Sequence, residues 1–151
     1  MAIKQKSVIQ ATMTGESPSH SLTNVSVRDV KFPIDEPIER GGTNLGPSPT
    51  ETAIAALIGC TSVIANKCAT KLGIDIGHLD IEATYSFDRR GAMMMEEIDI
   101  PFPKVVLNIV ANGAASDTQL QEVSAELNKF CPISKMFKAA GTEIEENWSR
   151  A

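Results

Sequence analysis

The sequence has little of what marks nucleic-acid-binding, membrane or secreted proteins. Its 151 residues carry a formal charge of -5, so no positive surface is offered to nucleic acid or to an anionic membrane. Aromatic residues make up only 5%, too few for a surface on which bases stack. The amino terminus lacks the apolar core of a signal peptide, and no stretch approaches the roughly 18 apolar residues that span a bilayer. We therefore expect a cytoplasmic protein.

Motifs for phosphate binding, hydride transfer and serine hydrolysis are also missing. The sequence contains no GxGxxG, GxxxxGK or GxSxG. His20 and His78 have no ligand-like spacing such as HxxxH, so we expect no metal site. The three cysteines form no CxxC pair, which argues against a secreted disulfide framework and a four-thiolate zinc site. In a reducing compartment such cysteines are either catalytic or inert.

The hydrophobic content of 42% is ample for a packed core. No repeat, low-complexity tract or linker divides the chain, so the sequence predicts a single domain over residues 1–151. Short mixed or alternating runs, separated by turn residues, predict strands. These runs cover residues 7–12, 21–30, 79–88, 93–100, 104–111 and 142–148.

A long helix is predicted from residue 49 to residue 72. Ser48 is a suitable N-cap, Pro49 suits the first helical position, and Glu51 completes a capping box. Gly73 supplies the stop. Apolar or small residues recur at spacings of three and four, at Ile54, Leu57, Ile58, Thr61, Ala65, Cys68 and Leu72. The other side is small and weakly polar, so we expect burial on most sides, by a sheet and by a second cover such as a partner subunit.

Two shorter helices follow towards the carboxyl end. Ser116 or Asp117 caps the first, which runs to Phe130, and Cys131 with Pro132 begins the second, which ends near residue 140.

The two cysteines Cys60 and Cys131 stand in unlike local settings. Cys131 lies at a helix start, where free amide groups and the helix dipole stabilise an anion by roughly 0.3–1 kcal/mol. Cys60 lies mid-helix, so any thiolate there needs a cation brought by the fold. Arg40 in the preceding loop is best placed by sequence, ahead of Arg28 and the pair Arg89-Arg90.

If the fold brings Cys60 and Cys131 together, the chain has a nucleophilic thiol and a second thiol to resolve it, as a thiol peroxidase needs. If it does not, both are core residues. Cys68 lies about 12 Å along the helix from Cys60 and about 80° around it, which rules out a disulfide between them within an intact helix. We assign Cys68 to packing.

Taken in order, three features resemble the OsmC/Ohr family over about residues 40–148. They are Gly42-Thr-Asn44, the helix that begins at Pro49 and contains Ala-Leu-Ile-Gly-Cys60, and Cys131-Pro-Ile-Ser134 before a final strand. The resemblance implies an α+β fold and an intertwined homodimer, with central helices packed between curved, mainly antiparallel sheets. It also implies that Cys60 is the peroxidatic cysteine and Cys131 the resolving one. The substrate would be an organic hydroperoxide, and a dithiol of lipoyl type would recycle the enzyme without a cofactor.

The residues around the predicted nucleophile depart from the family's peroxidase branches. There an Arg from the loop pairs with a Glu ten residues before the first cysteine, and Thr50 occupies that position here. Glu51 lies nine residues before Cys60, about 180° away on an ideal helix, and can serve either as a site residue with Arg40 or as a cap. The pattern is closer to the broader OsmC-like group. The alternatives are a non-catalytic protein that binds a small apolar ligand in a dimer-interface cleft, and a purely structural interaction protein.

Overall fold

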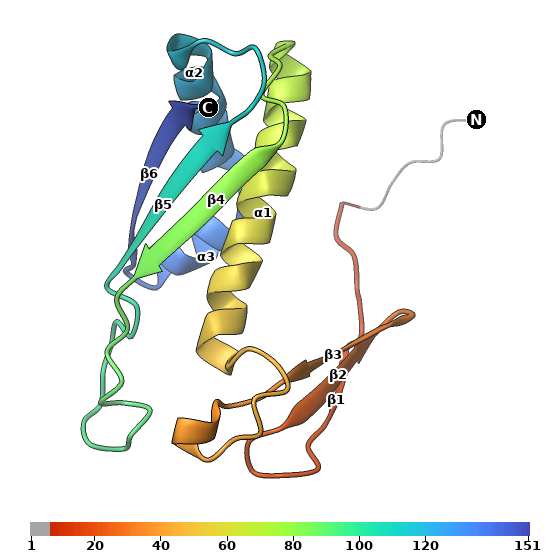
Figure 1. Cartoon of the computed structure of the whole chain (residues 1–151), viewed down its shortest axis with the longest axis vertical. Helices are drawn as coiled ribbons and strands as arrows, with labels where there is room; N and C mark the ends of the chain where they lie inside the picture. Colours follow the sequence, from red (N-terminus) through yellow and green to blue (C-terminus); the bar gives the residue numbers. More distant parts are fainter. Residues whose placement is uncertain (1–6) are drawn as a thin grey trace. The chain divides into compact units, whose positions relative to one another are not determined.

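The structure is a computed structural model that describes residues 7–151 (Figure 1). The chain forms two compact units, one ending at Ala53 and the other beginning at Ile54. The boundary lies in the first turns of the long helix α1 (Pro49–Leu72). Each unit is described below by itself.

The N-terminal unit contains a three-stranded antiparallel sheet in the order β1-β2-β3. Its strands are β1 (Thr14–Glu16), β2 (Thr23–Val27) and β3 (Val30–Ile34). The strand predicted over residues 7–12 is therefore wrong, since the first strand, β1, lies after that stretch. Strand pairing decides this, because residues 14–16 are the ones that find partners on β2.

The strand predicted over residues 21–30 is instead a tight hairpin. The chain reverses at Arg28-Asp29, and Val27 pairs with Val30 across the turn. Arg28 has a φ of 53°, in the left-handed region that only a few non-glycine residues adopt. No Gly or Asn marks this turn, and Asp29 is the one residue in it of a type that favours turns, so the signal in the sequence is weak.

The segment after β3 folds around the buried carboxylate of Asp35. This side chain accepts hydrogen bonds from the amides of Glu36 (2.8 Å), Thr43 (3.1 Å) and Leu45 (3.1 Å), and from the Thr43 hydroxyl. The Thr43 hydroxyl and these amides outweigh burial and lower the pKa of Asp35 to about 2. A side chain at Gly42 would collide with the Glu36 carbonyl, which explains glycine there. The short 3-10 helix η1 (Ile38–Arg40) lies within this segment.

The helix α1 (Pro49–Leu72) confirms the predicted bounds. Its start is a capping box, in which the Ser48 amide donates to the Glu51 carboxylate (2.7 Å) and the Glu51 amide donates to the Ser48 hydroxyl (3.3 Å). Gly73 ends the helix with a φ of 68°.

Only one face of α1 is buried within the chain. The buried residues are Ile54, Leu57, Thr61, Ala65, Cys68 and Ala69. The opposite face of small residues is open, and Val63 on it is 54% exposed. The burial of α1 on most sides, which the sequence predicted, is therefore not found in a single copy.

By length and composition alone α1 could cross a bilayer, which corrects the expectation that no segment is long and apolar enough to do so.

The C-terminal unit contains the sheet β4-β5-β6, formed by β4 (Leu79–Tyr85), β5 (Lys104–Ala111) and β6 (Glu143–Arg150). β4 and β5 are antiparallel, whereas β5 and β6 are parallel. The strand predicted over residues 93–100 is a loop instead. Arg90 organises this loop by binding Asp88 and Glu96, with a 2.6 Å contact to each.

The parallel pairing of β5 and β6 requires a crossover, which α2 (Asp117–Phe130) and α3 (Pro132–Ala139) provide. Ser116 caps α2 in a capping box with Gln119, as the sequence predicted. Residues of α1, α2 and the sheet meet in one core, which includes Ala65, Cys68, Ala111, Leu120, Val123, Leu127 and Cys131. Figure 1 shows the three helices behind the β4-β5-β6 sheet.

The buried carboxylate gives a prediction for acid stability. Because the pKa of Asp35 falls from its usual 3.8 to about 2, its ionised form stabilises the fold above about pH 4, and this contribution is lost as the pH falls towards 2. We expect Asp35→Asn to lower the melting temperature at pH 7 by about 5 °C or more. The variant should also lose less further stability than the wild type between pH 4 and pH 2.

Circular dichroism melts across this pH range measure both effects. Asp29→Asn, in the exposed β2–β3 turn, is the matched control and should follow the wild type. Identical acid profiles for the wild type and Asp35→Asn would contradict the prediction.

Candidate functional site

The structure brings Cys60 and Cys131 into direct contact. Cys60 lies in the middle of α1, and Cys131 lies at the junction of α2 and α3, 71 residues later. The two sulfur atoms are 3.3 Å apart, and the Cys131 thiol donates to the Cys60 sulfur. Both thiols are free. The separation suits direct formation of a disulfide after a small movement.

The backbone of two helices fixes the Cys131 sulfur. Cys131 ends α2, where its amide donates to the Leu127 carbonyl (2.9 Å), and its own carbonyl accepts from the Lys135 amide (3.0 Å) in α3. Pro132 begins α3, and the Ser134 amide donates to the Cys131 sulfur at 3.5 Å. This confirms the predicted position of the thiol at a helix start.

Burial reverses the predicted effect of that helix start. Cys131 is 0% exposed, and burial raises the pKa of its thiol to about 11. The amides of Ser134 and Ile133 act in the opposite direction, whereas the nearby Cys60 adds to the rise. The helix start therefore stabilises the thiolate, as predicted, but burial outweighs this effect, and Cys131 is a neutral thiol at pH 7.

Cys60 is the more accessible member of the pair. It is partly buried and packs against the core cluster that contains Cys131. A reagent from solution therefore meets the Cys60 sulfur first, while Cys131 stays behind it as a protonated donor.

Cys68 takes no part in this contact. It is 5% exposed, and burial, followed by the Glu126 carboxylate, raises its pKa. Among the described residues its sulfur bonds to neither of the other cysteines, in agreement with the predicted packing role.

Arg40 and Glu51 come close to each other in the N-terminal unit. The Arg40 guanidinium donates to the Glu36 carboxylate (2.6 Å). The Glu51 carboxylate accepts from the Ser48 amide, which is the main reason that its pKa is lowered, and the charge of Arg40 contributes. Glu51 is thus a cap with a cation nearby, and a role for either residue at Cys60 stays a prediction.

Ser134 is a feature that the sequence reasoning passed over. Its hydroxyl is buried and has no hydrogen-bond partner among the described residues, one helical turn after Cys131. A serine three residues after a capping cysteine is the only sequence signal for it. Nowhere in residues 7–151 do three His, Cys, Asp or Glu side chains form a group suited to a metal ion.

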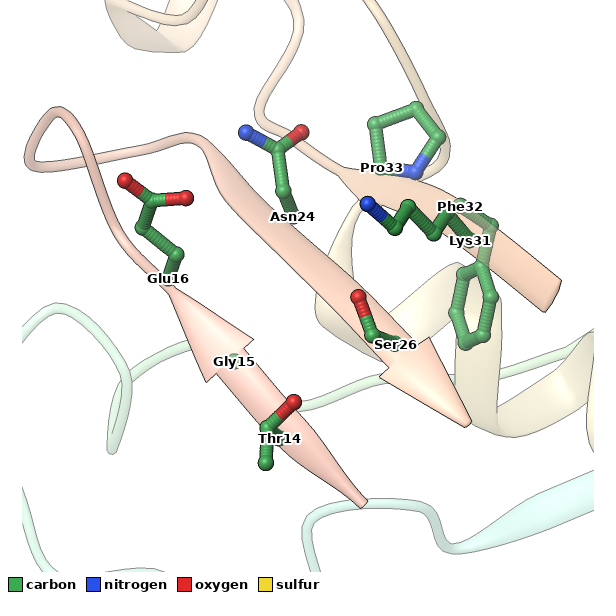
Figure 2. Close-up of a pocket in the computed structure, with 8 residues that line it drawn as sticks. All are labelled: Thr14, Gly15, Glu16, Asn24, Ser26, Lys31, Phe32 and Pro33. Atoms are coloured by element: carbon green, nitrogen blue, oxygen red, sulfur yellow. The ribbon is translucent and has the colours of Figure 1, made fainter. Parts of the chain in front are cut away.

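Figure 2 shows a separate hollow on the N-terminal sheet. It has a volume of about 480 Å³ and is lined by Thr14, Gly15, Glu16, Asn24, Ser26, Lys31, Phe32 and Pro33. None of the predicted site residues lies there, and its side chains include no nucleophilic thiol.

Comparisons with known proteins agree with this architecture. A sequence model of the family described as OsmC-like protein matches residues 42–147. No curated protein matches the chain. An OsmC-like protein from Mycoplasma pneumoniae has a similar structure, with a TM-score of 0.79 and 18% identity over 95% of this chain and 98% of that one.

Two further structures carry names that mention hydroperoxides. An organic hydroperoxide resistance protein OsmC from Legionella pneumophila matches with a TM-score of 0.71 and 14% identity, over 95% of this chain and 99% of that one. The organic hydroperoxide resistance protein OhrB of Bacillus subtilis matches with a TM-score of 0.62 and 21% identity, over 93% and 98%. At such identities these likenesses establish the shared α+β fold. With the family match over more than half of its length, the chain belongs to the OsmC-like protein family.

Proposed function

We propose that this protein is a thiol-dependent peroxidase that reduces organic hydroperoxides, with Cys60 as the peroxidatic cysteine and Cys131 as the resolving one. The observation that carries the proposal is the 3.3 Å contact between the two sulfur atoms. Membership of a family with hydroperoxide resistance proteins among its structural neighbours supports the same chemistry.

In the first step, the Cys60 thiolate attacks the terminal oxygen of the hydroperoxide. The O–O bond breaks, the alkoxide takes a proton and leaves as an alcohol, and Cys60 becomes a sulfenic acid. Assignment of this step to Cys60 rests on its exposure, because the Cys131 thiol is fully buried and has a raised pKa.

In the second step, the Cys131 sulfur attacks the sulfenic sulfur of Cys60. A disulfide forms, and the sulfenic hydroxyl leaves as water with the proton that Cys131 carried. The sulfur atoms need to approach by only about 1.3 Å to reach a normal S–S bond. A dithiol then reduces the disulfide by exchange, is itself oxidised to a disulfide, and restores both thiols.

Arg40 is our candidate for the cation that orders the Cys60 thiolate. The Ser48 amide is the main cause of the lowered pKa of Glu51, and the positive charge of Arg40 adds to it. In this proposal Glu51 holds Arg40 in place and also caps α1. It thereby replaces the Glu that the family's peroxidase branches carry ten residues before the cysteine, where this chain has Thr50.

We also propose that the protein is a cytoplasmic homodimer. The exposed face of α1 is small and apolar, with Ala55, Gly59 and Val63 along it. A second copy can cover this face closely because these side chains are short. Such cover would remove the largest apolar residue of the face, Val63, from water.

The first prediction concerns turnover. With an organic hydroperoxide and a dithiol, we expect the turnover rate of Cys60→Ser to fall to background. The turnover rate of Cys131→Ser should fall at least about tenfold, because the sulfenic acid formed on Cys60 then has no resolving thiol. Cys68→Ser is the matched control and should keep wild-type turnover. Wild-type rates in Cys60→Ser would refute the assignment.

The second prediction concerns the cation. Arg40→Gln should slow oxidation of Cys60 by hydroperoxide about 10- to 100-fold, and Glu51→Gln, which keeps a capping oxygen, should slow it less. Stopped-flow measurement of the oxidation rate separates this step from reduction by the dithiol. Arg89→Gln, a control with the same loss of charge, should leave the rate unchanged. An Arg40→Gln rate equal to the wild type would exclude Arg40 from the site.

The third prediction concerns assembly. Analytical ultracentrifugation should find a dimer for the wild type at micromolar concentration and a monomer for Val63→Asp, because a carboxylate would be buried in the interface. Val8→Asp changes an 80% exposed valine outside α1 and should remain dimeric. A monomeric wild type would contradict the proposed assembly.

A further inference from the structure

The Ser134 hydroxyl is the one buried side-chain oxygen or nitrogen in residues 7–151 that has no hydrogen-bond partner. Ser134 is 4% exposed and lies in the first turn of α3. A buried polar group without a hydrogen bond costs free energy, so native proteins keep few of them. Where such a group lies beside a reactive residue, a role in the reaction is one physical explanation for it.

Ser134 shares its helical turn with the resolving thiol. Cys131 is the N-cap of α3, and Ser134 is the third residue of that helix. The Ser134 amide already donates to the Cys131 sulfur at 3.5 Å, and the Ile133 amide also lowers the pKa of this thiol. In a capping box the side chain at this third position reaches back towards the N-cap. The helix geometry therefore keeps the Ser134 hydroxyl within a short reach of the Cys131 sulfur.

The resting thiol gives this hydroxyl little to bind. Cys131 donates its proton to the Cys60 sulfur, and a neutral thiol sulfur is only a weak acceptor. A sulfur that carries negative charge is a stronger acceptor, because the hydrogen bond is then charge-assisted. A change of the Ser134 χ1 rotamer can then bring its hydroxyl to the sulfur. An interaction that forms only as the charge develops lowers the barrier of that step without stabilising the resting state.

No lysine, arginine or histidine of the described residues supplies this stabilisation. Burial, the amides of Ser134 and Ile133, and Cys60 are the causes that shift the pKa of Cys131. Cys60 is the titratable group that faces the sulfur, and it raises this pKa. Lys135, the next residue of α3, is exposed. Donors from the first turn of α3 therefore act on the sulfur without help from a cation.

We propose that the Ser134 hydroxyl donates a hydrogen bond to the Cys131 sulfur while this sulfur attacks Cys60, and so speeds disulfide formation. The inference rests on the proposed function and adds a residue to its second step. There the Cys131 proton passes to the sulfenic hydroxyl, the S–O bond of Cys60 breaks, water leaves and the S–S bond forms. The Cys131 sulfur is oxidised and the sulfenic sulfur is reduced. Ser134 keeps its own proton throughout.

An aromatic disulfide isolates this step from the reduction of hydroperoxides. In a Cys68→Ser parent, dithiobis(nitrobenzoate) first exchanges with the accessible Cys60 and releases one nitrothiobenzoate. The Cys131 sulfur then attacks the Cys60 sulfur of the mixed disulfide, loses its proton to solvent and releases a second nitrothiobenzoate. We expect Ser134→Ala to leave the rate of the first release unchanged and to slow the second at least about tenfold, because a hydrogen bond to a charged group is lost.

Two further variants separate the hydroxyl from packing. Ser134→Thr keeps the hydroxyl and should keep most of the second rate. Ser124→Ala removes a hydroxyl of α2 that donates to Glu146 and should change neither rate. Ser134→Ala should also melt no lower than the parent, because the hydroxyl that it removes makes no hydrogen bond to the described residues.

Three results would overturn the inference. The first is a second release that is equally fast in Ser134→Ala and in its parent. The second is a release that Ser134→Thr slows as much as Ser134→Ala does. The third is a slowed release in Ser134→Ala that comes with a lower melting temperature, since altered packing would then account for the loss of rate.

Turnover of an organic hydroperoxide, measured alongside, separates this inference from the proposed function. If the wild type consumed no hydroperoxide while Ser134→Ala slowed the second release, the peroxidase would be refuted and the role of Ser134 in thiol exchange supported. If the wild type consumed hydroperoxide and Ser134→Ala formed the disulfide as fast as its parent, the peroxidase would stand and this inference would be overturned.

Discussion

The contact between the Cys60 and Cys131 sulfur atoms is the interaction on which the chemistry of this fold depends. It joins positions 71 residues apart, so it exists only because α1 packs against the junction of α2 and α3. The core around Ala65 and Leu127 holds these elements together. The crossover that carries Cys131 is in turn required by the parallel pairing of β5 and β6. The geometry of the two thiols thus depends on the packing of the helices, which depends in turn on the topology of the sheet.

In the proposed mechanism, the two thiols have different roles because their surroundings differ. Cys131 is fully buried, so it stays protonated at pH 7 and can supply the proton that leaves with water. Cys60 is partly exposed, so a reagent from solution can reach its sulfur. A buried resolving thiol behind an accessible one lets substrate reach only the first.

Much of this could be predicted from local sequence chemistry. The capping box at Ser48, the stop at Gly73 and the helix start at Cys131 are each encoded within a few residues, and all three were confirmed. The α+β fold followed from the ordered motifs. The rest depends on contacts between distant segments. Burial of Cys131 outweighs its helix start, the hairpin at Arg28 carries only a weak turn signal, and Asp35 binds amides up to ten residues away. A single sequence without the fold places none of these.

One measurement tests the central claim most directly. The fully reduced protein is treated with one equivalent of an organic hydroperoxide, the remaining thiols are blocked, and the peptides are mapped by mass spectrometry. The account predicts a Cys60–Cys131 disulfide within each chain and an unmodified Cys68. A protein that retains three free thiols, or that forms a disulfide through Cys68, would contradict it.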